Sequence, residues 1–292
     1  MKKFLIVFLL AISVSVTGVL TSEVNGAAKS ITVSNSREFL EALGSDRIIK
    51  MKPGNYILSE WDPFLNNRPE QAPRYANIKD KGKLKLAKGV TWSDDPFDGG
   101  ELILNGIKNL TINSVNDKGP AGNLIVDPRY AFVMKFVKCS NITIRNITAG
   151  HSEGGYCSGG VFEFTDSSKI TITDTNMYGC GTEGLVLLNV SDMKVASSMI
   201  YECTYDIMAV SGGKNIVFEE CIFSDNREFT LITISETKNI SFTKCKFIDN
   251  RGEMFSVRDT TVLVSNSTFE RNITEYPIKN SNNISFKECT FD

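Results

Sequence analysis

The chain has 292 residues, with 32 Lys or Arg, 34 Asp or Glu, and a formal net charge of −2. A chain without a basic surplus cannot displace phosphate counterions, so this balance argues against a nucleic-acid binder. Its single histidine excludes a metal site built from several histidines. Hydrophobic residues make up 41% of the chain, which is enough for a sizeable core and argues against a disordered protein.

The first 28 residues are predicted to be a signal peptide of bacterial type. Lys2 and Lys3 supply positive charge, residues 4–20 are apolar, and Gly26-Ala27-Ala28 provides small residues before a cut at Lys29. The alternative is an uncleaved anchor, because an apolar run of about 17 residues is at the lower limit for a membrane span. We therefore expect a secreted, periplasmic or cell-surface protein that has no membrane span once the signal is removed.

From residue 142 onward the sequence repeats. Each repeat begins with an apolar residue that is followed two positions later by another, and these anchors are Ile142, Ile170, Met193, Ile216, Ile240, Val262 and Ile284. Alternation with a period of two indicates strands whose apolar side chains face inward, and the Gly, Asn, Asp and Ser between them indicate turns. Short strands that recur in this way predict an all-β fold, a single-domain parallel β-helix whose coils stack about 4.8 Å apart.

The repeated Asn-Ile-Thr-Ile or Asn-Ile-Ser-Phe, followed by Cys-x-Phe, resembles the right-handed parallel β-helix repeat of the pectate-lyase-like superfamily, which has the pectin lyase fold. The resemblance covers residues 100–292 and, more loosely, 47–99. It implies a right-handed solenoid over residues 29–292, with a short helix capping its N-terminal end. Residues 36–44 match such a helix, with Ser36 as the N-cap and Gly44 as the stop. Residues 59–99 are predicted to be a loop insertion, and the fold itself serves many activities.

One coil is longer than the others and carries the only histidine. Its turn reads Gly150-His151-Ser152-Glu153-Gly154-Gly155-Tyr156-Cys157-Ser158-Gly159-Gly160. His151 has an ordinary pKa near neutrality, and with Glu153 it is a candidate general base. The alternative is a histidine that holds the turn by hydrogen bonding.

Acidic side chains recur thirteen positions after the anchors, as Glu183, Asp206, Glu253 and Glu275. Two acids one coil apart repel each other unless a cation or a shared proton relieves them. Glu183 and Asp206, together with Glu153, are therefore predicted either to hold Ca²⁺ or to act as an acid and base on a glycan. The alternative is a solvated acidic edge. No cofactor is certain from the sequence, and Ca²⁺ is the possible one at this group of acids.

Three tyrosines accompany these acids. Tyr178 and Tyr201 share one repeat position, and Tyr156 belongs to the turn of the long coil. Their rings are candidate substrate-binding groups, because an aromatic face can stack on the apolar face of a sugar. The alternative is that they are simply exposed side chains.

Two further columns are expected in the turns. Cys157, Cys180 and Cys203 are 23 residues apart and should stack, either as a disulfide, as a zinc site with His151, or as free thiols. Asn226, Asn250 and Asn272 are predicted to form a ladder in which amides bond from coil to coil.

The superfamily's catalytic patterns are not reproduced here. Polygalacturonase-like members carry Asp pairs and a Gly-His-Gly, whereas Gly150-His151-Ser152 matches only the first two residues and Asp94-Asp95 lies in the insertion. Pectate lyases use an Arg or Lys base, and neither Arg129 nor Arg227 can be assigned to that role.

The sequence therefore leaves two functions open. The first is an exported protein that binds or cleaves a polysaccharide along one face of the solenoid; as an enzyme it would be a polysaccharide lyase or a glycoside hydrolase. The second is a non-catalytic surface or adhesive protein of the cell envelope. In this second case the coil end at residues 283–292, where no capping helix follows, would serve self-association or dock a partner.

Overall fold

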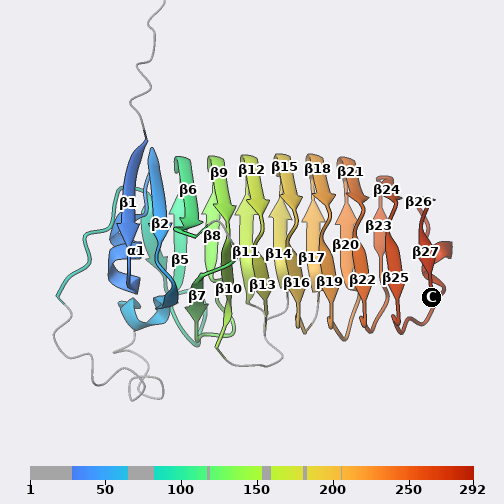
Figure 1. The fold of residues 1–292 in the computed structure, drawn as a ribbon, viewed down its shortest axis with the longest axis horizontal. Coiled ribbons are helices and arrows are strands. Elements are labelled where there is room, and N and C mark those ends of the chain that lie inside the picture. Colours follow the sequence, from blue (N-terminus) through green and yellow to red (C-terminus); the bar gives the residue numbers. More distant parts are fainter. Residues whose placement is uncertain (1–27, 65–81, 117–118, 153–158, 180–182, 205) are drawn as a thin grey trace, which may run out of the picture.

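The computed structural model describes residues 28–64, 82–116, 119–152, 159–179, 183–204 and 206–292. Within them the chain winds into three long sheets around one interior, and each turn of the chain adds a strand to each sheet in succession (Figure 1). Every strand pair is parallel except β4 with β5. The predicted all-β, right-handed parallel β-helix is therefore confirmed.

We name the sheets A, B and C. In order along the solenoid, sheet A contains β1 (Lys29–Val33), β2 (Arg47–Met51), β6 (Lys108–Ser114), β9 (Ser140–Arg145), β12 (Ser168–Thr173), β15 (Ser191–Ala196), β18 (Lys214–Glu219), β21 (Lys238–Thr243), β24 (Val262–Ser265) and β26 (Ile284–Lys287). Sheet B contains β3 (Gly54–Ile57), β7 (Gly122–Val126), β10 (Ile147–His151), β13 (Asn176–Tyr178), β16 (Met199–Tyr201), β19 (Ile222–Ser224), β22 (Lys246–Ile248), β25 (Thr268–Glu270) and β27 (Thr290–Phe291). Sheet C contains β4 (Val90–Ser93), β5 (Glu101–Asn105), β8 (Met134–Val137), β11 (Gly160–Thr165), β14 (Glu183–Leu188), β17 (Asp206–Ser211), β20 (Ile232–Ser235) and β23 (Ser256–Arg258).

Equivalent side chains stack in the interior, as the repeat predicts. Ile216 pairs in register with Ile240, and their exposed fractions are 0% and 2%. The phenylalanines seven positions after the anchors form a stack in sheet B, with ring centroids 5.0 Å apart for Phe223 and Phe247 and 4.5 Å apart for Phe247 and Phe269. Burial of these columns along the whole axis supplies the main stabilisation of the fold.

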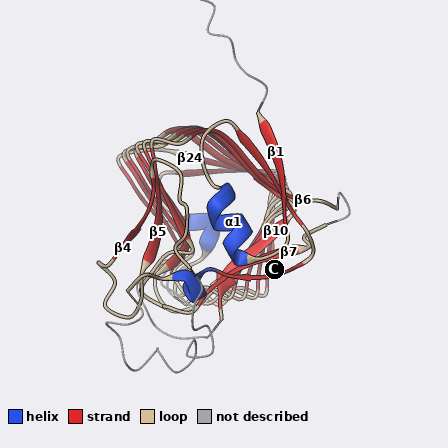
Figure 2. Cartoon of the chain, turned by 90° about the vertical axis from the view of Figure 1, so that its left-hand side faces the viewer, coloured by secondary structure: helices blue, strands red, loops and turns tan. Residues whose placement is uncertain are grey.

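The N-terminal end of the solenoid is covered by α1 (Ser36–Ala42), as Figure 2 shows. Two of its own side chains, Phe39 and Leu40, are fully buried. The predicted N-cap, Ser36, is wrong by one residue. Asn35 has extended backbone angles and its side chain accepts the N–H of Glu38, so Asn35 is the cap.

Two segments were not expected from the repeat. The strand β1 pairs with β2 along its whole length, although Lys29–Val33 lies before the first coil that the sequence indicated. The predicted insertion of residues 59–99 contains β4 and most of the short 3₁₀ helix η1 (Leu58–Trp61). Because β4 runs antiparallel to β5, it extends sheet C beyond the regular coils.

The predicted Asn ladder is confirmed in the turns between sheets B and C. The side-chain amide of Asn226 donates to Oδ1 of Asn250 at 2.9 Å, and that of Asn250 donates to Oδ1 of Asn272 at 3.0 Å. Asn226 and Asn250 are completely buried, so the ladder pairs polar groups that would otherwise be costly inside the fold.

Candidate functional site

The predicted acidic pair lies side by side at the corner between sheets B and C. Glu183 is the first residue of β14 and Asp206 the first residue of β17, and the two pair in register. The residues that follow them face the interior: a Cβ on Gly184 would lie 2.4 Å from a side-chain carbon of Ile200, and Ile207 is fully buried. The two half-buried carboxylates are therefore left on the outer side of neighbouring strands, which lie about 4.8 Å apart.

Burial and mutual repulsion change how this pair titrates. Burial raises the pKa of Glu183 to about 7, and the carboxylates of Asp206 and Glu163 add to the rise. Burial also raises the pKa of Asp206 to about 6. Near neutral pH the corner therefore presents a carboxylic acid beside a carboxylate, which is the combination needed for general acid and base chemistry.

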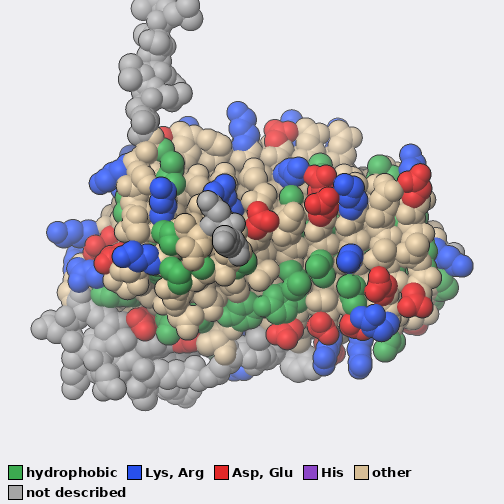
Figure 3. Space-filling view, in the orientation of Figure 1, with side chains coloured by type: hydrophobic (Ala, Val, Ile, Leu, Met, Phe, Trp, Pro, Cys, Tyr) green, Lys and Arg blue, Asp and Glu red, His purple; other side chains and the backbone are tan. Residues whose placement is uncertain are grey.

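The predicted tyrosine pair lies at the ends of the neighbouring strands of sheet B. Tyr178 and Tyr201 are in register, with ring centroids 5.9 Å apart and planes inclined by 32°. Tyr178 packs against Gly150, where a Cβ would lie only 2.7 Å from two carbons of the tyrosine ring. Both rings are half-buried. Figure 3 shows hydrophobic side chains gathered in the lower middle of the face that it presents.

His151 is not part of this outer surface. It is the last residue of β10, it is 2% exposed, and its Nε2–H donates to the carbonyl of Ala131 at 2.9 Å. Burial lowers the pKa of His151, so the ring is neutral at pH 7. This geometry is that of a histidine that holds a turn by hydrogen bonding, and the role of His151 as a general base stays a prediction.

Four predicted positions fall outside the described residues. They are Glu153 and Tyr156 of the candidate site, and Cys157 and Cys180 of the predicted cysteine column. The binding of Ca²⁺ by Glu153, Glu183 and Asp206 therefore stays a prediction. Within the described part of the chain, no three His, Cys, Asp or Glu side chains converge closely enough to hold a metal ion, and Cys203 is buried.

Sequence reasoning missed a buried ionic cluster on sheet C. Nζ of Lys135 lies 3.0 Å from Glu101 and 3.1 Å from Glu163, and Glu101 also accepts the N–H of Phe132 at 2.8 Å. Burial works to lower the pKa of Lys135, but the two carboxylates outweigh it and the pKa is raised. Lys135 and Glu163 are 28 residues apart, which is also the spacing of the anchors Ile142 and Ile170. Because equal spacing places two residues opposite each other in neighbouring coils, the sequence could have predicted this pair.

Three parallel sheets wound around one interior define the protein as a parallel β-helix, with an acidic and aromatic corner between sheets B and C. The family described as right handed beta helix region matches residues 105–269 and 210–292, which is more than half of the chain. The chain therefore belongs to this family.

One solved structure with a TM-score above 0.5 supports the same fold. The chain is similar to a rhamnogalacturonan lyase, with a TM-score of 0.55 and 11% identity over 88% of this chain and 72% of that one. It also shows similarity to an alginate lyase from Paenibacillus sp. str. FPU-7, with a TM-score of 0.40 and 9% identity over 90% of this chain and 99% of that one. The surface protein and adhesin PfbA of Streptococcus pneumoniae gives a TM-score of 0.39 and 9% identity over 90% and 86% of the two chains. No curated protein matches the sequence.

No helix within the described ranges combines the length and the apolar character required to cross a membrane.

Proposed function

We propose that this chain is an exported protein that binds or cleaves a polysaccharide along the corner between sheets B and C. The observation that carries the proposal is the in-register pair Glu183 and Asp206, whose pKa values are raised to about 7 and about 6, next to the rings of Tyr178 and Tyr201. A glycan needs both kinds of group, because its ring faces are apolar while its hydroxyls and glycosidic oxygens are polar. The similarity to the rhamnogalacturonan lyase concerns the fold. The proposed function is supported by the residues of the corner.

The chemistry follows from the two protonation states. Protonated Glu183 gives its proton to the glycosidic oxygen as the bond to the sugar breaks, and ionised Asp206 stabilises or attacks the positive centre that develops on the sugar. Water then completes the hydrolysis and restores the proton. Both groups belong to rigid strands, which hold them in place without any movement of the fold.

The test compares Glu183→Gln, Asp206→Asn and Tyr201→Ala with the unaltered chain. We expect the first two to lower the release of reducing ends from a polysaccharide panel by about 100-fold or more, because each removes a proton-transfer group. Tyr201→Ala should weaken glycan binding by about tenfold, the equivalent of about 1.4 kcal/mol. The control is Glu236→Gln, which alters an exposed carboxylate at the corner between sheets C and A. Unchanged binding and turnover in all three variants would remove this site from consideration.

The same experiment tests the non-catalytic alternative. That alternative is favoured by the burial of the only histidine, which leaves no imidazole on the outer surface. A surface or adhesive protein would bind glycans through Tyr178 and Tyr201 and would release no product. Unsaturated products would instead identify a lyase, and repetition with a chelator would reveal a requirement for Ca²⁺. Self-association at the C-terminal coil end stays a prediction.

A further inference from the structure

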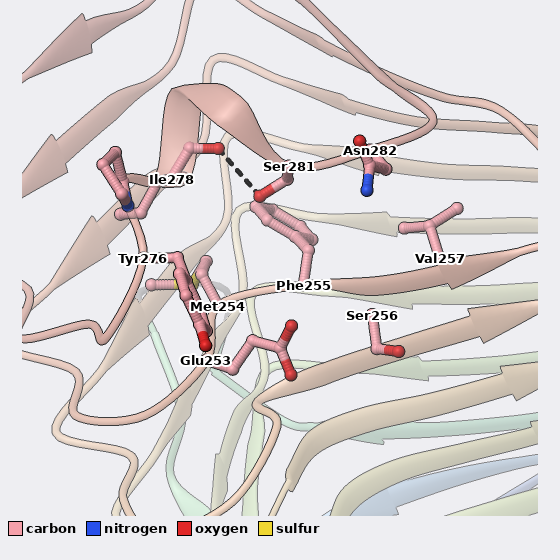
Figure 4. Close-up of a pocket in the computed structure, with 10 residues that line it drawn as sticks. Glu253, Met254, Phe255, Ser256, Val257, Tyr276, Ile278, Ser281 and Asn282 are labelled. Carbon is pink, nitrogen blue, oxygen red and sulfur yellow. Dashed lines mark hydrogen bonds between the residues drawn. The ribbon is translucent and has the colours of Figure 1, made fainter.

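Sheet C ends one coil earlier than its neighbours. Sheets A and B continue to β26 and β27, whereas the described residues that follow β23 on this side form the 3₁₀ helix η3 (Ile278–Asn280). The place of the next strand is taken by a pocket of about 380 Å³ between β23 and η3 (Figure 4). This volume falls within the range of small-ligand sites in proteins, which starts at about 300 Å³.

The pocket combines an apolar floor with a polar rim. Met254 and Phe255, which are 2% and 4% exposed, belong to the floor, and Ile278 closes one side. Figure 4 shows Tyr276 and Glu253 on one side of Phe255, and Ser281 and Asn282 on the other. A sugar ring has the same two-sided character, since its C–H face packs on apolar or aromatic groups while its hydroxyls need hydrogen-bond partners.

The rim carries groups placed for such contacts. Tyr276 is 65% exposed, so its ring is accessible from the mouth of the pocket. Glu253 accepts the hydroxyl of Thr230 at 2.8 Å, which orients its carboxylate and leaves further lone pairs for a ligand hydroxyl.

The pocket continues the row of residues that begins at the acidic corner. Asp206 belongs to the coil of β17, Thr230 to the next coil, and Glu253 to the one after, where Thr233 pairs with Ser256. The rise per coil is about 4.8 Å, so Glu253 at the rim of the pocket lies two coils, or about 10 Å, beyond Asp206. The rise of one coil is close to the length that one sugar unit adds to an extended glycan. A chain that lies on Tyr201 and Asp206 and follows the solenoid axis therefore reaches the pocket within a few units.

We propose that this pocket is a distal subsite for one uncharged pyranose unit of the same polysaccharide chain. This inference takes its class of ligand, a polysaccharide, from the proposed function and rests on it to that extent. Among the described residues that line the pocket, the charged side chain is Glu253, a carboxylate, and a uronic acid would place like charge beside it. The subsite therefore accepts neutral sugars in preference to uronates.

The test uses size-graded cello-, laminari- and chito-oligosaccharides of two to six units, titrated by calorimetry against the full chain. Tyr276→Ala should weaken the binding of the six-unit ligand by about tenfold and leave the two-unit ligand unchanged, because only the longer chain reaches from the corner to the pocket. Glu253→Ala should have the same length dependence. The control Leu188→Ala removes an exposed apolar side chain, 38% accessible, at the corner between sheets C and A, and should change nothing at any length.

The outcomes separate this inference from the proposed function. An equal loss at all lengths, or no loss in Tyr276→Ala and Glu253→Ala, overturns the subsite. If these variants behave as expected while Glu183→Gln and Asp206→Asn leave the release of reducing ends unchanged, the acid and base roles at the corner fail and the subsite stands. If the unaltered chain binds none of these oligosaccharides, the subsite is overturned. Tighter binding of oligogalacturonates than of neutral ligands contradicts the preference for uncharged sugars.

Discussion

Glu183 and Glu219 lie at different corners of the solenoid, and their pKa values move in opposite directions. Burial raises the pKa of Glu183 to about 7, with a further rise from Asp206 and Glu163. Nζ of Lys194 lies 2.7 Å from the carboxylate of Glu219, and this hydrogen bond lowers the pKa of Glu219. The chemistry of each carboxylate therefore depends on what the neighbouring coils place next to it.

The raised pKa of Glu183 predicts a pH-dependent stability. A carboxyl with a higher pKa in the folded chain than in the unfolded chain holds more protons when folded, so its contribution is full below about pH 4.5 and is lost as the pH rises through about 7. The free energy of unfolding of Glu183→Gln, relative to that of the unaltered chain, should therefore be higher at pH 8 than at pH 4 by about 1–2 kcal/mol. This figure is reduced because the side chain is only half-buried. Guanidinium unfolding at both pH values measures this gain, and Glu219→Gln should not show it. An equal difference at pH 4 and pH 8 would contradict the expected titration.

The elements of the coil are joined by turns that contain two kinds of amide ladder. Asn250 is buried between Asn226 and Asn272, and it also donates to the carbonyl of Phe223 at 2.8 Å. Asn239 belongs to an exposed ladder and donates to Asn215 at 3.0 Å, with a φ of 55°. Only the buried ladder has no access to water as a substitute partner, so it contributes more to holding neighbouring turns in register.

Replacement of Asn250 and Asn239 by alanine measures how much the buried and the exposed ladder each contribute to stability. Asn250→Ala leaves several buried amide and carbonyl groups unpaired and should lower the free energy of unfolding by about 3 kcal/mol or more. Asn239→Ala should cost only about 1 kcal/mol, mainly because alanine is less favourable at positive φ. Urea unfolding monitored by circular dichroism measures both values. Equal costs for the two variants would show that burial of the ladder is unimportant.

At the scale of the whole molecule, the solenoid is nearly one-dimensional. Each coil contacts only its neighbours, so Phe247 stacks on Phe223 and Phe269, while Phe136 belongs to a separate stack with Phe164 several coils away. Stability should then be close to a sum of contributions from the coils and from the interfaces between neighbouring coils. Substitutions in different stacks should therefore change the free energy of unfolding independently, whereas substitutions within one stack should not.

A double-mutant cycle tests this organisation. Phe136→Leu and Phe247→Leu should lower the free energy of unfolding by amounts that add within about 0.5 kcal/mol, because the side chains share no partner. Phe223→Leu and Phe247→Leu are in direct contact, and their combined effect should depart from the sum by more than that. Coupling of the distant pair as strong as that of the adjacent pair would contradict a one-dimensional stability.

The sequence by itself determined the architecture of this protein. The spacing of anchors such as Ile216 and Ile240 specified parallel strands with a shared interior, and the same arithmetic identified the Asn ladder and paired Glu183 with Asp206. These predictions succeeded because a solenoid converts distance along the chain directly into position in space. The helix cap, by contrast, was predicted one residue too late, because the hydrogen bond from the N–H of Glu38 is accepted by Asn35 and not by Ser36.

Only the tertiary structure decided which of these residues face water and how they titrate. It buried His151 against the carbonyl of Ala131, joined Lys135 to Glu101 and Glu163, and opened the pocket where sheet C stops before sheets A and B. The physical reason is that desolvation depends on all the atoms around a group, including those of loops and strands that do not follow the repeat. Periodicity specifies which residues are neighbours between coils, and the packing of irregular segments decides what those neighbours can do.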